Sequence, residues 1–183
     1  MKLAPIIQQI QAECPVFTQV AGSITSDLDT AISQNNLPVA YVVRLDEDAE
    51  AVDDAGNEWF QELTEYFSVV VILSQEDPRG QLASDNLDDI RSELFRALLR
   101  WSPDETHDRI GYQGGELVGV DRERLIYAYN FRMYTTLNKD DTWQKVAYDR
   151  LQPCKGIDID VDEIGPREHK PDGEIEAKLK IDF

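Results

Sequence analysis

The sequence predicts an α+β domain, in which an antiparallel or mixed sheet is flanked by helices. In residues 62–73 apolar side chains recur with the period of two that is typical of a strand, at Phe67, Val69, Val71 and Leu73. Residues 82–101 repeat apolar side chains every three to four positions, which indicates a helix. Residues 125–137 alternate again, with one apolar and one mixed face, as expected of an antiparallel strand that is exposed on one side.

Three elements are expected before residue 60. Pro5 suits the first turn of a helix, and Pro15 ends that helix. Residues 26–33 are expected to form a second short helix, because acidic side chains in the first turn favour its positive end. Residues 39–45 are apolar at nearly every position, which predicts a mostly buried strand.

The long helix carries signals at both of its ends. Ser84 or Asp85 is the expected N-cap, and Pro103 stops the helix. Acidic residues come early and basic residues late, an order that complements the helix dipole. These residues are Asp88, Asp89, Arg91, Arg96 and Arg100. A short strand that contains several glycines is expected at residues 112–120.

Beyond residue 140 the apolar pattern weakens. Residues 143–151 suit a short helix, and residues 157–161 and 177–183 alternate like strands without an obvious core of their own. We therefore expect a domain at residues 1–150, followed by an acidic C-terminal extension at residues 151–183 that forms an extended arm.

Charge excludes several classes of function. The 36 acidic and 18 basic residues give a net charge of -18, a field that repels nucleic acid and anionic membranes. Binding to a phosphate backbone needs a face rich in lysine and arginine, and the sequence shows none. No apolar run approaches the roughly 20 residues of a membrane span. Cys14 and Cys154 belong to no CxxC motif, which predicts free thiols in a reducing cytoplasm.

Sequence patterns typical of binding sites are weak. Asp158, Asp160 and Asp162 have the spacing of a calcium loop, but Glu163 occupies its glycine position and His169 its bidentate glutamate position. We interpret this segment as the acidic face of a strand. The glycines between residues 111 and 119 lack the features of a phosphate loop and are interpreted as turn or bulge residues.

No catalytic, cofactor or metal site is predicted. His107 and His169 are the only histidines, and both are expected on the surface. Glu62 and Glu65 are the acidic residues embedded in an apolar strand, and both are expected to face solvent. A small hydrolase whose site assembles only in space remains an alternative.

The segment from residue 46 to residue 58 carries seven acidic residues and no basic one. It is interpreted as a long solvated connection between two strands, with a long projecting hairpin as the alternative. Its functional interpretation is a negative wall facing a lumen or rim, past which DNA slides without binding. The residues are Asp46, Glu47, Asp48, Glu50, Asp53, Asp54 and Glu58.

Five short segments occur in a recognisable order. They are APII at residues 4–7, LPVAYVV at 37–43, YFSVVV at 66–71, RALLRWSP at 96–103 and YQGGEL at 112–117. In this order they resemble the tail terminator, or tail completion, proteins of tailed bacteriophages, in the small family often labelled Gp37-like. The resemblance covers residues 4 to 137.

The resemblance implies a structural virion protein without catalytic or cofactor residues. It implies a homohexameric ring that caps the tail tube, stops its polymerisation and offers the head–tail joining surface. The implied partners are further copies of the chain, the tail tube protein, the head–tail connector or stopper, and the sheath if the tail is contractile. DNA is expected to pass through the lumen without specific binding, and no membrane is involved.

Contacts between subunits are expected on surfaces that are less acidic. Basic residues of the domain are one set, and apolar residues of the C-terminal arm, which is able to add as a strand to a neighbour's sheet edge, are the other. They are Arg122, Arg124, Arg132, Ala177, Leu179, Ile181 and Phe183. The alternatives are a disordered tail, another connector or tube-associated ring protein, and an acidic mimic of DNA that inhibits a nucleic-acid enzyme.

Overall fold

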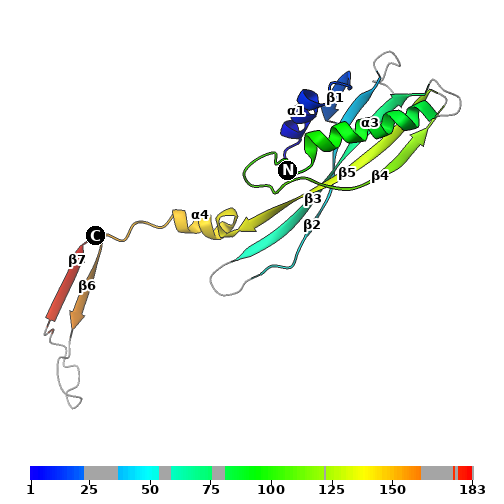
Figure 1. The fold of residues 1–183 in the computed structure, drawn as a ribbon. Coiled ribbons are helices and arrows are strands. Elements are labelled where there is room, and N and C mark those ends of the chain that lie inside the picture. The colour runs from blue at the N-terminus through cyan, green and yellow to red at the C-terminus, as the bar shows by residue number, and fades with distance from the viewer. Residues whose placement is uncertain are drawn as a thin grey trace. The chain divides into compact units, whose positions relative to one another are not determined.

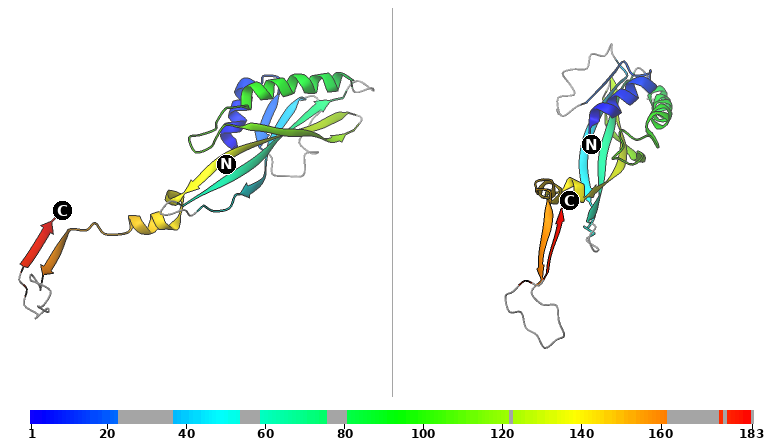
Figure 2. Two further views of the ribbon diagram at one scale, coloured as in Figure 1. Left: turned by 60° about the horizontal axis from the view of Figure 1, so that its bottom comes forward. Right: turned by 90° about the vertical axis from the view of Figure 1, so that its left-hand side faces the viewer.

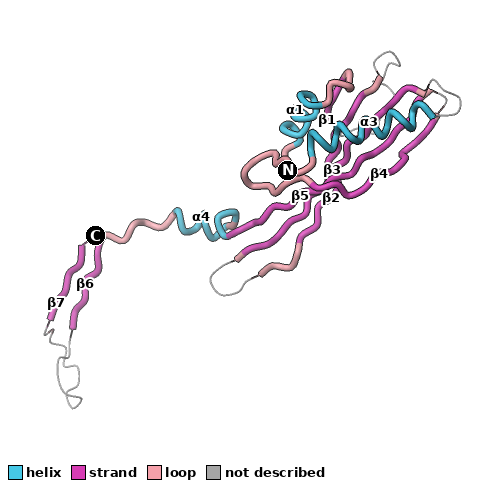
Figure 3. Tube along the Cα trace, viewed as in Figure 1, coloured by secondary structure: helices cyan, strands magenta, loops and turns pink. Residues whose placement is uncertain are grey.

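The computed structural model describes residues 1–22, 37–53, 59–75, 81–121, 123–161, 175 and 177–182. The chain divides into two compact units, residues 1–141 and residues 142–183. In the described part, the first unit holds a five-stranded sheet and the second a two-stranded sheet. Figure 3 shows the helices and strands of each unit along the Cα trace.

The first unit has a mixed sheet with the strand order β1-β2-β3-β5-β4 (Figure 1). β1 runs parallel to β2, and the other neighbouring strands are antiparallel. The predicted α+β class is therefore confirmed. The elements are α1 (Leu3–Glu13), β1 (Gln19–Gly22), β2 (Val39–Ala49), β3 (Phe60–Ser74), α3 (Gln81–Leu98), β4 (Gly111–Val120), β5 (Arg124–Asn138) and a 3₁₀ helix (Lys139–Asp141).

α1 and α3 cover one face of this sheet, and Figure 2 shows them on the same side. Alternate side chains of each strand point to that face, so the predicted apolar stripes of β3 and β5 form the core. At its centre the rings of Phe67 and Phe131 stack with centroids 5.3 Å apart. The helices contribute apolar residues at helical spacing, which are Ile6, Ile10, Ile90, Leu94 and Leu98.

The ends of α3 differ from the prediction. The helix begins at Gln81, so Ser84 and Asp85 lie inside it and neither is the N-cap. It ends at Leu98, and Trp101 lies beyond it, where its N–H donates to the Leu98 carbonyl at 3.1 Å. The chain turns off the helix at Arg100, which has a φ of 64°. Capping preferences are worth about 1 kcal/mol, so the packing of the helix on the sheet decides where it starts and stops.

β2 is longer than the predicted strand and alters the interpretation of the acidic segment. It pairs with β3 as far as Ala49, which lies opposite Leu63, and Asp53 forms a further bridge to Phe60. The solvated connection was therefore wrong for residues 46–49, which pair with β3 as part of the sheet. The long hairpin is found, but it does not project from the sheet, because β5 pairs with β3 as far as Phe60. The helix predicted at residues 26–33 lies outside the described residues. β1, only four residues long, was not predicted.

The second unit contains α4 (Trp143–Asp149), β6 (Gly156–Val161) and β7 (Ala177–Asp182). The short helix and both strands were predicted, but their pairing was not. β6 and β7 form an antiparallel pair in which Ile157 lies opposite Ile181 and Ile159 opposite Leu179. The apolar residues of both strands therefore share one face of the hairpin.

Candidate assembly surfaces

The acidic residues of β2 are exposed but point to two different faces of the sheet. Asp46 and Asp48 line a pocket on the sheet face that α1 and α3 leave uncovered. Glu47 instead reaches Arg44, with 2.7 Å between its Oε2 and the arginine Nη2. Glu50 and Asp53 are exposed beyond the end of the strand. Asp54 and Glu58, which were predicted to belong to the same surface, lie outside the described residues.

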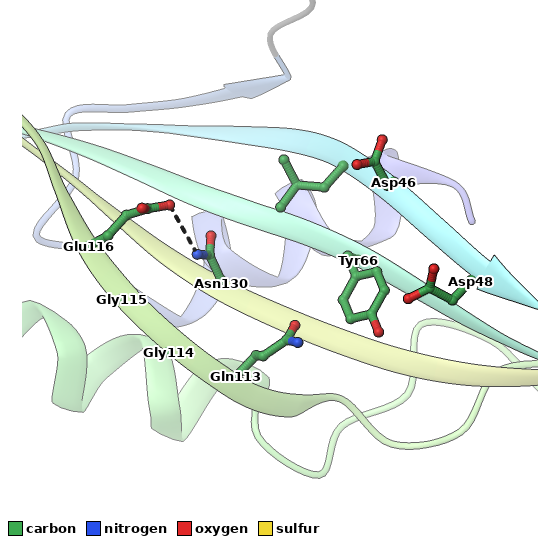
Figure 4. A pocket seen from close by; sticks show the side chains of 9 residues that line it. Asp46, Asp48, Tyr66, Gln113, Gly114, Gly115, Glu116 and Asn130 are labelled. Atoms are coloured by element: carbon green, nitrogen blue, oxygen red, sulfur yellow. Dashed lines mark hydrogen bonds between the residues drawn. The ribbon is translucent and has the colours of Figure 1, made fainter.

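The pocket on the uncovered face has a volume of about 580 Å³ (Figure 4). The hydroxyl of Tyr66 is hydrogen-bonded to Asp48, and this bond raises the pKa of the phenol above its ordinary value. The Asn130 side chain donates to Glu116 Oε1 at 3.4 Å. The lining residues are Leu45, Asp46, Asp48, Tyr66, Gln113, Gly114, Gly115, Glu116 and Asn130. Three carboxylates thus make this face electronegative, which suits repulsion of a polyanion.

Two glycines of β4 that line this pocket have special backbone requirements. Gly114 has a φ of +152° and lies at a shift in the register between β4 and β5, so the predicted bulge is confirmed there. A Cβ on Gly115 would lie 2.7 Å from Tyr127 Cε1 and 2.9 Å from the Tyr112 hydroxyl oxygen. β4 therefore packs its backbone directly against the ring of Tyr127.

A second polar cluster lies at the edge of the core and was missed from the sequence. Glu65 is only 3% exposed. Its Oε2 lies 2.8 Å from His107 Nε2, and its Oε1 lies 3.2 Å from Arg44 Nη2 and 2.5 Å from the Met1 α-ammonium. The predictions that Glu65 and His107 face solvent were both wrong. The sequence did contain a sign that Glu65 is buried. Alternate residues of a strand share one face, and residue 65 alternates with the buried residues 67 and 69.

His107 bridges two carboxylates. Its Nδ1 lies 2.7 Å from Asp104 Oδ1, while Nε2 faces Glu65. Burial alone would raise the pKa of Glu65, but hydrogen bonds and charge from the Met1 ammonium and His107 bring that pKa below its ordinary value. The hydrogen bond from His107 likewise lowers the pKa of Asp104.

This cluster joins segments that are distant in the sequence. It ties the start of the chain and the loop after α3 to β3, and a pocket of about 600 Å³ adjoins it. The arrangement therefore holds these elements together. Within the described ranges, no three His, Cys, Asp or Glu side chains are grouped to hold a metal ion. No helix in the same ranges is long and apolar enough to cross a membrane.

The predicted contact residues do not gather at one place. Arg124 pairs with Asp121 at the β4–β5 turn, with 3.1 Å between Nη2 and Oδ2. Arg132 lies further along β5, over the ring of Tyr134 at 5.4 Å. Leu179 and Ile181 share the apolar face of β7 with Ala177. Arg122 and Phe183 lie outside the described residues.

An apolar surface on β4 was not predicted. Leu117, Val118 and Val120 are 57%, 58% and 53% exposed, near the end of a strand at the edge of the sheet. Side chains of this size at a sheet edge are typical of surfaces that contact another chain.

The first unit corresponds to a known protein family. Residues 1–142 match the family model of the phage tail terminator protein, so the match spans the whole five-stranded unit. No curated protein gives a significant match to the chain. The narrower Gp37-like label stays a prediction. The chain belongs to the phage tail terminator family and is a structural component of a bacteriophage tail.

Proposed function

We propose that this chain forms a hexameric ring that caps the tail tube, ends its polymerisation and presents the head–tail joining surface. The observation that carries this proposal is the family match over the whole first unit. The sheet of that unit supports it, because α1 and α3 cover one face, while the acidic pocket on the other face and the β4 edge are exposed. Elsewhere on that second face Val39, Tyr41 and Ile72 are buried.

Charge decides how the copies of the ring are oriented. Six copies carry 6 × -18 = -108, so surfaces in contact have to exclude most of the acidic residues. The uncovered face with Asp46, Asp48 and Glu116 then lines the lumen or the rim. A lumen of this sign repels the DNA phosphates, and the DNA passes without binding.

The contacts between copies use surfaces outside the acidic pocket, and Arg132, opposite Tyr66, lies on the same sheet face as that pocket. Arg124 and Arg132 supply positive charge on β5, together with Arg122, and β7 supplies Ala177, Leu179 and Ile181, followed by Phe183. The tail tube protein binds one side of the ring and the head–tail connector the other, with the sheath as a further partner in a contractile tail. Assembly takes place in the host cytoplasm, and residues 151–183 act as an arm that exchanges between subunits.

The test uses the full chain and the tail tube protein of the same phage. Purified tube protein is polymerised with and without the chain, and tubes are measured by negative-stain electron microscopy. We expect rings of six on tube ends and tubes that stop growing once capped. Tubes that elongate equally in both reactions, with no ring at their ends, would contradict the proposal. Rings that bind the head connector but never the tube would assign the chain to the connector instead.

A further inference from the structure

β4 is a long sheet edge that lacks lysine and proline and has two shifts in its register with β5, at Tyr112/Gly114 and at Leu117/Gly119. It has ten residues and pairs with β5 on one side, and no described strand pairs with its other side. Exposed edges usually carry lysine or proline, which block pairing with another chain. β4 has neither, and Glu116 is its only charged residue. The outer side of β4 can therefore pair with an additional strand through its main-chain N–H and C=O groups. The exposed aliphatic side chains of Leu117 and Val120 lie beside them.

The β6–β7 hairpin has an apolar face that the second unit does not cover. Ile157, Ile159, Leu179 and Ile181 are between 38% and 53% exposed. A two-stranded sheet is at best marginally stable in water unless its apolar face packs against something. The hairpin therefore requires a surface that contributes both further strand pairing and apolar contacts.

On the opposite face of the hairpin, β6 carries acidic side chains and β7 carries basic ones. Asp158 and Asp160 lie on β6, directly opposite Lys180 and Lys178 on β7. The two strands together contain two lysines and three aspartates, a net charge of -1 in a chain of -18. Two copies of this acidic chain therefore meet little repulsion at the hairpin.

We infer that β7 of one copy pairs with the β4 edge of the neighbouring copy and extends its five-stranded sheet. This inference rests on the proposed ring, which brings copies of the chain side by side. In this arrangement the hairpin of one copy binds the exposed β4 edge of the next. Main-chain hydrogen bonds join β7 to β4, and side chains make contacts on both faces of the extended sheet.

The side chains of the two strands match on both faces of the extended sheet. Leu117 and Val120 lie opposite Tyr127 and Leu125. The shift in register between Leu117 and Gly119 brings both side chains, although three positions apart, to the face that α1 and α3 cover. Glu116 points to the uncovered face, where it lines the acidic pocket. A strand that places aliphatic side chains on the first face and lysines on the second complements this edge.

β7 meets both requirements and β6 meets only one. Leu179 and Ile181 of β7 alternate with Lys178 and Lys180, so its lysines come to lie beside Glu116. β6 has the same aliphatic spacing but alternates with Asp158 and Asp160, which would repel Glu116. Charge thus selects β7 as the pairing strand and leaves β6 on the outside.

Cross-linking between two populations of full-length chain tests this pairing. Both carry Cys154→Ser, which removes an exposed thiol, and one carries Leu117→Cys while the other, marked by a size tag, carries Leu179→Cys. With a short bismaleimide, we expect a product that contains one chain of each kind. Asp53→Cys, an exposed site on the β2–β3 hairpin, replaces Leu117→Cys as the control and should give at least about tenfold less product.

A charge exchange tests the choice of strand. Glu116→Lys is the first variant. The second exchanges the hairpin charges, with Lys178→Glu and Lys180→Glu accompanied by Asp158→Lys and Asp160→Lys, so that opposite charges still face each other across β6 and β7. Each variant alone should weaken self-association about tenfold or more, measured by sedimentation. Mixing the two variants should restore association, because each altered edge then meets an altered β7. Restoration only when all the changes are in one chain would show that the hairpin folds back on its own copy, which would overturn the inference.

The outcomes separate the inference from the proposed function. If electron microscopy shows rings but the cross-link is absent, or forms only within single chains, the pairing of β7 with β4 is overturned and the capping role still stands. Intact cross-linking in a chain that fails to cap tubes retains the pairing and overturns the capping role.

Discussion

Glu65 and His107 lie 42 positions apart in the sequence, yet Oε2 of the glutamate and Nε2 of the histidine are 2.8 Å apart at the edge of the core. Asp104 holds the other ring nitrogen, and Arg44 and Met1 hold the second oxygen of Glu65. This network joins β3 to the loop after α3 and to the start of the chain. It therefore contributes to the frame that keeps the assembly surfaces in place.

Glu65→Gln should destabilise the first unit by about 2–3 kcal/mol, because it leaves charged partners beside a neutral amide in a nearly buried site. Urea unfolding of the full chain, followed by far-UV circular dichroism, measures the effect. Glu62→Gln on the same strand is the matched control, and its exposed side chain predicts a change within about 0.5 kcal/mol. Equal effects of the two substitutions would contradict a structural role for the cluster.

The same cluster makes stability depend on acid pH. The pKa of Glu65 is lowered from 4.5, and that of Asp104 from 3.8, in the folded chain. Because the folded pKa values lie below the unfolded ones, this stabilisation is fully present above about pH 4.5 and is lost as the pH falls through the folded values. The difference in unfolding free energy between the natural chain and Glu65→Gln should therefore shrink on acidification. A difference that stays constant from pH 7 to pH 3 would count against the linkage.

Gly115→Ala should destabilise the β4–β5 pair by about 1–2 kcal/mol, since the new methyl group meets the ring of Tyr127 at 2.7 Å. Gly119→Ala provides the control on the same strand, because no atom lies within 4 Å of its Cβ position. Thermal unfolding compares the two. Replacing Tyr127 with leucine should reduce the penalty of Gly115→Ala, and an unchanged penalty would refute the proposed clash.

Arg100→Gly should raise stability by about 0.5–1 kcal/mol, because a φ of 64° costs an ordinary residue more than glycine. Arg96→Gly, also an exposed arginine but inside α3, should instead lower stability by about 1 kcal/mol. Urea midpoints measure both changes in stability. Because the same arginine-to-glycine substitution is made at both positions, changes of opposite sign identify the effect of the positive φ at residue 100. Destabilisation of similar size at both positions would contradict it.

Self-association should strengthen as salt rises from about 0.02 M to 0.15 M. Each chain carries -18, and the screening length shortens to about 8 Å over this range, so repulsion between copies falls. The inferred contact of two lysines with Glu116 weakens at the same time, but it involves far fewer charges. Sedimentation equilibrium at several salt concentrations measures how the association constant changes with salt. An association constant that does not change would argue against the proposed orientation of the copies.

Local patterns in the sequence were sufficient to predict most of the elements. The period of two in β3 and β5 and the period of three to four in α3 arise from geometry within a few residues, so the apolar faces followed directly from them. The acidic composition and the order of short segments pointed to a phage tail protein. Residue 65 also alternates with the core residues of β3, but a glutamate at such a position is more often exposed than buried.

The tertiary structure alone decided how distant segments meet. His107 bridges Glu65 and Asp104 in a mostly buried position because the loop after α3 lies against β3. The pairing of β6 with β7 likewise joins segments that are separated in the sequence. It also revealed β4 as an edge, because strand order depends on backbone pairing between remote segments. Periodicity depends on neighbours along the chain and is written in the sequence, whereas pairing and burial depend on the free energy of the whole fold.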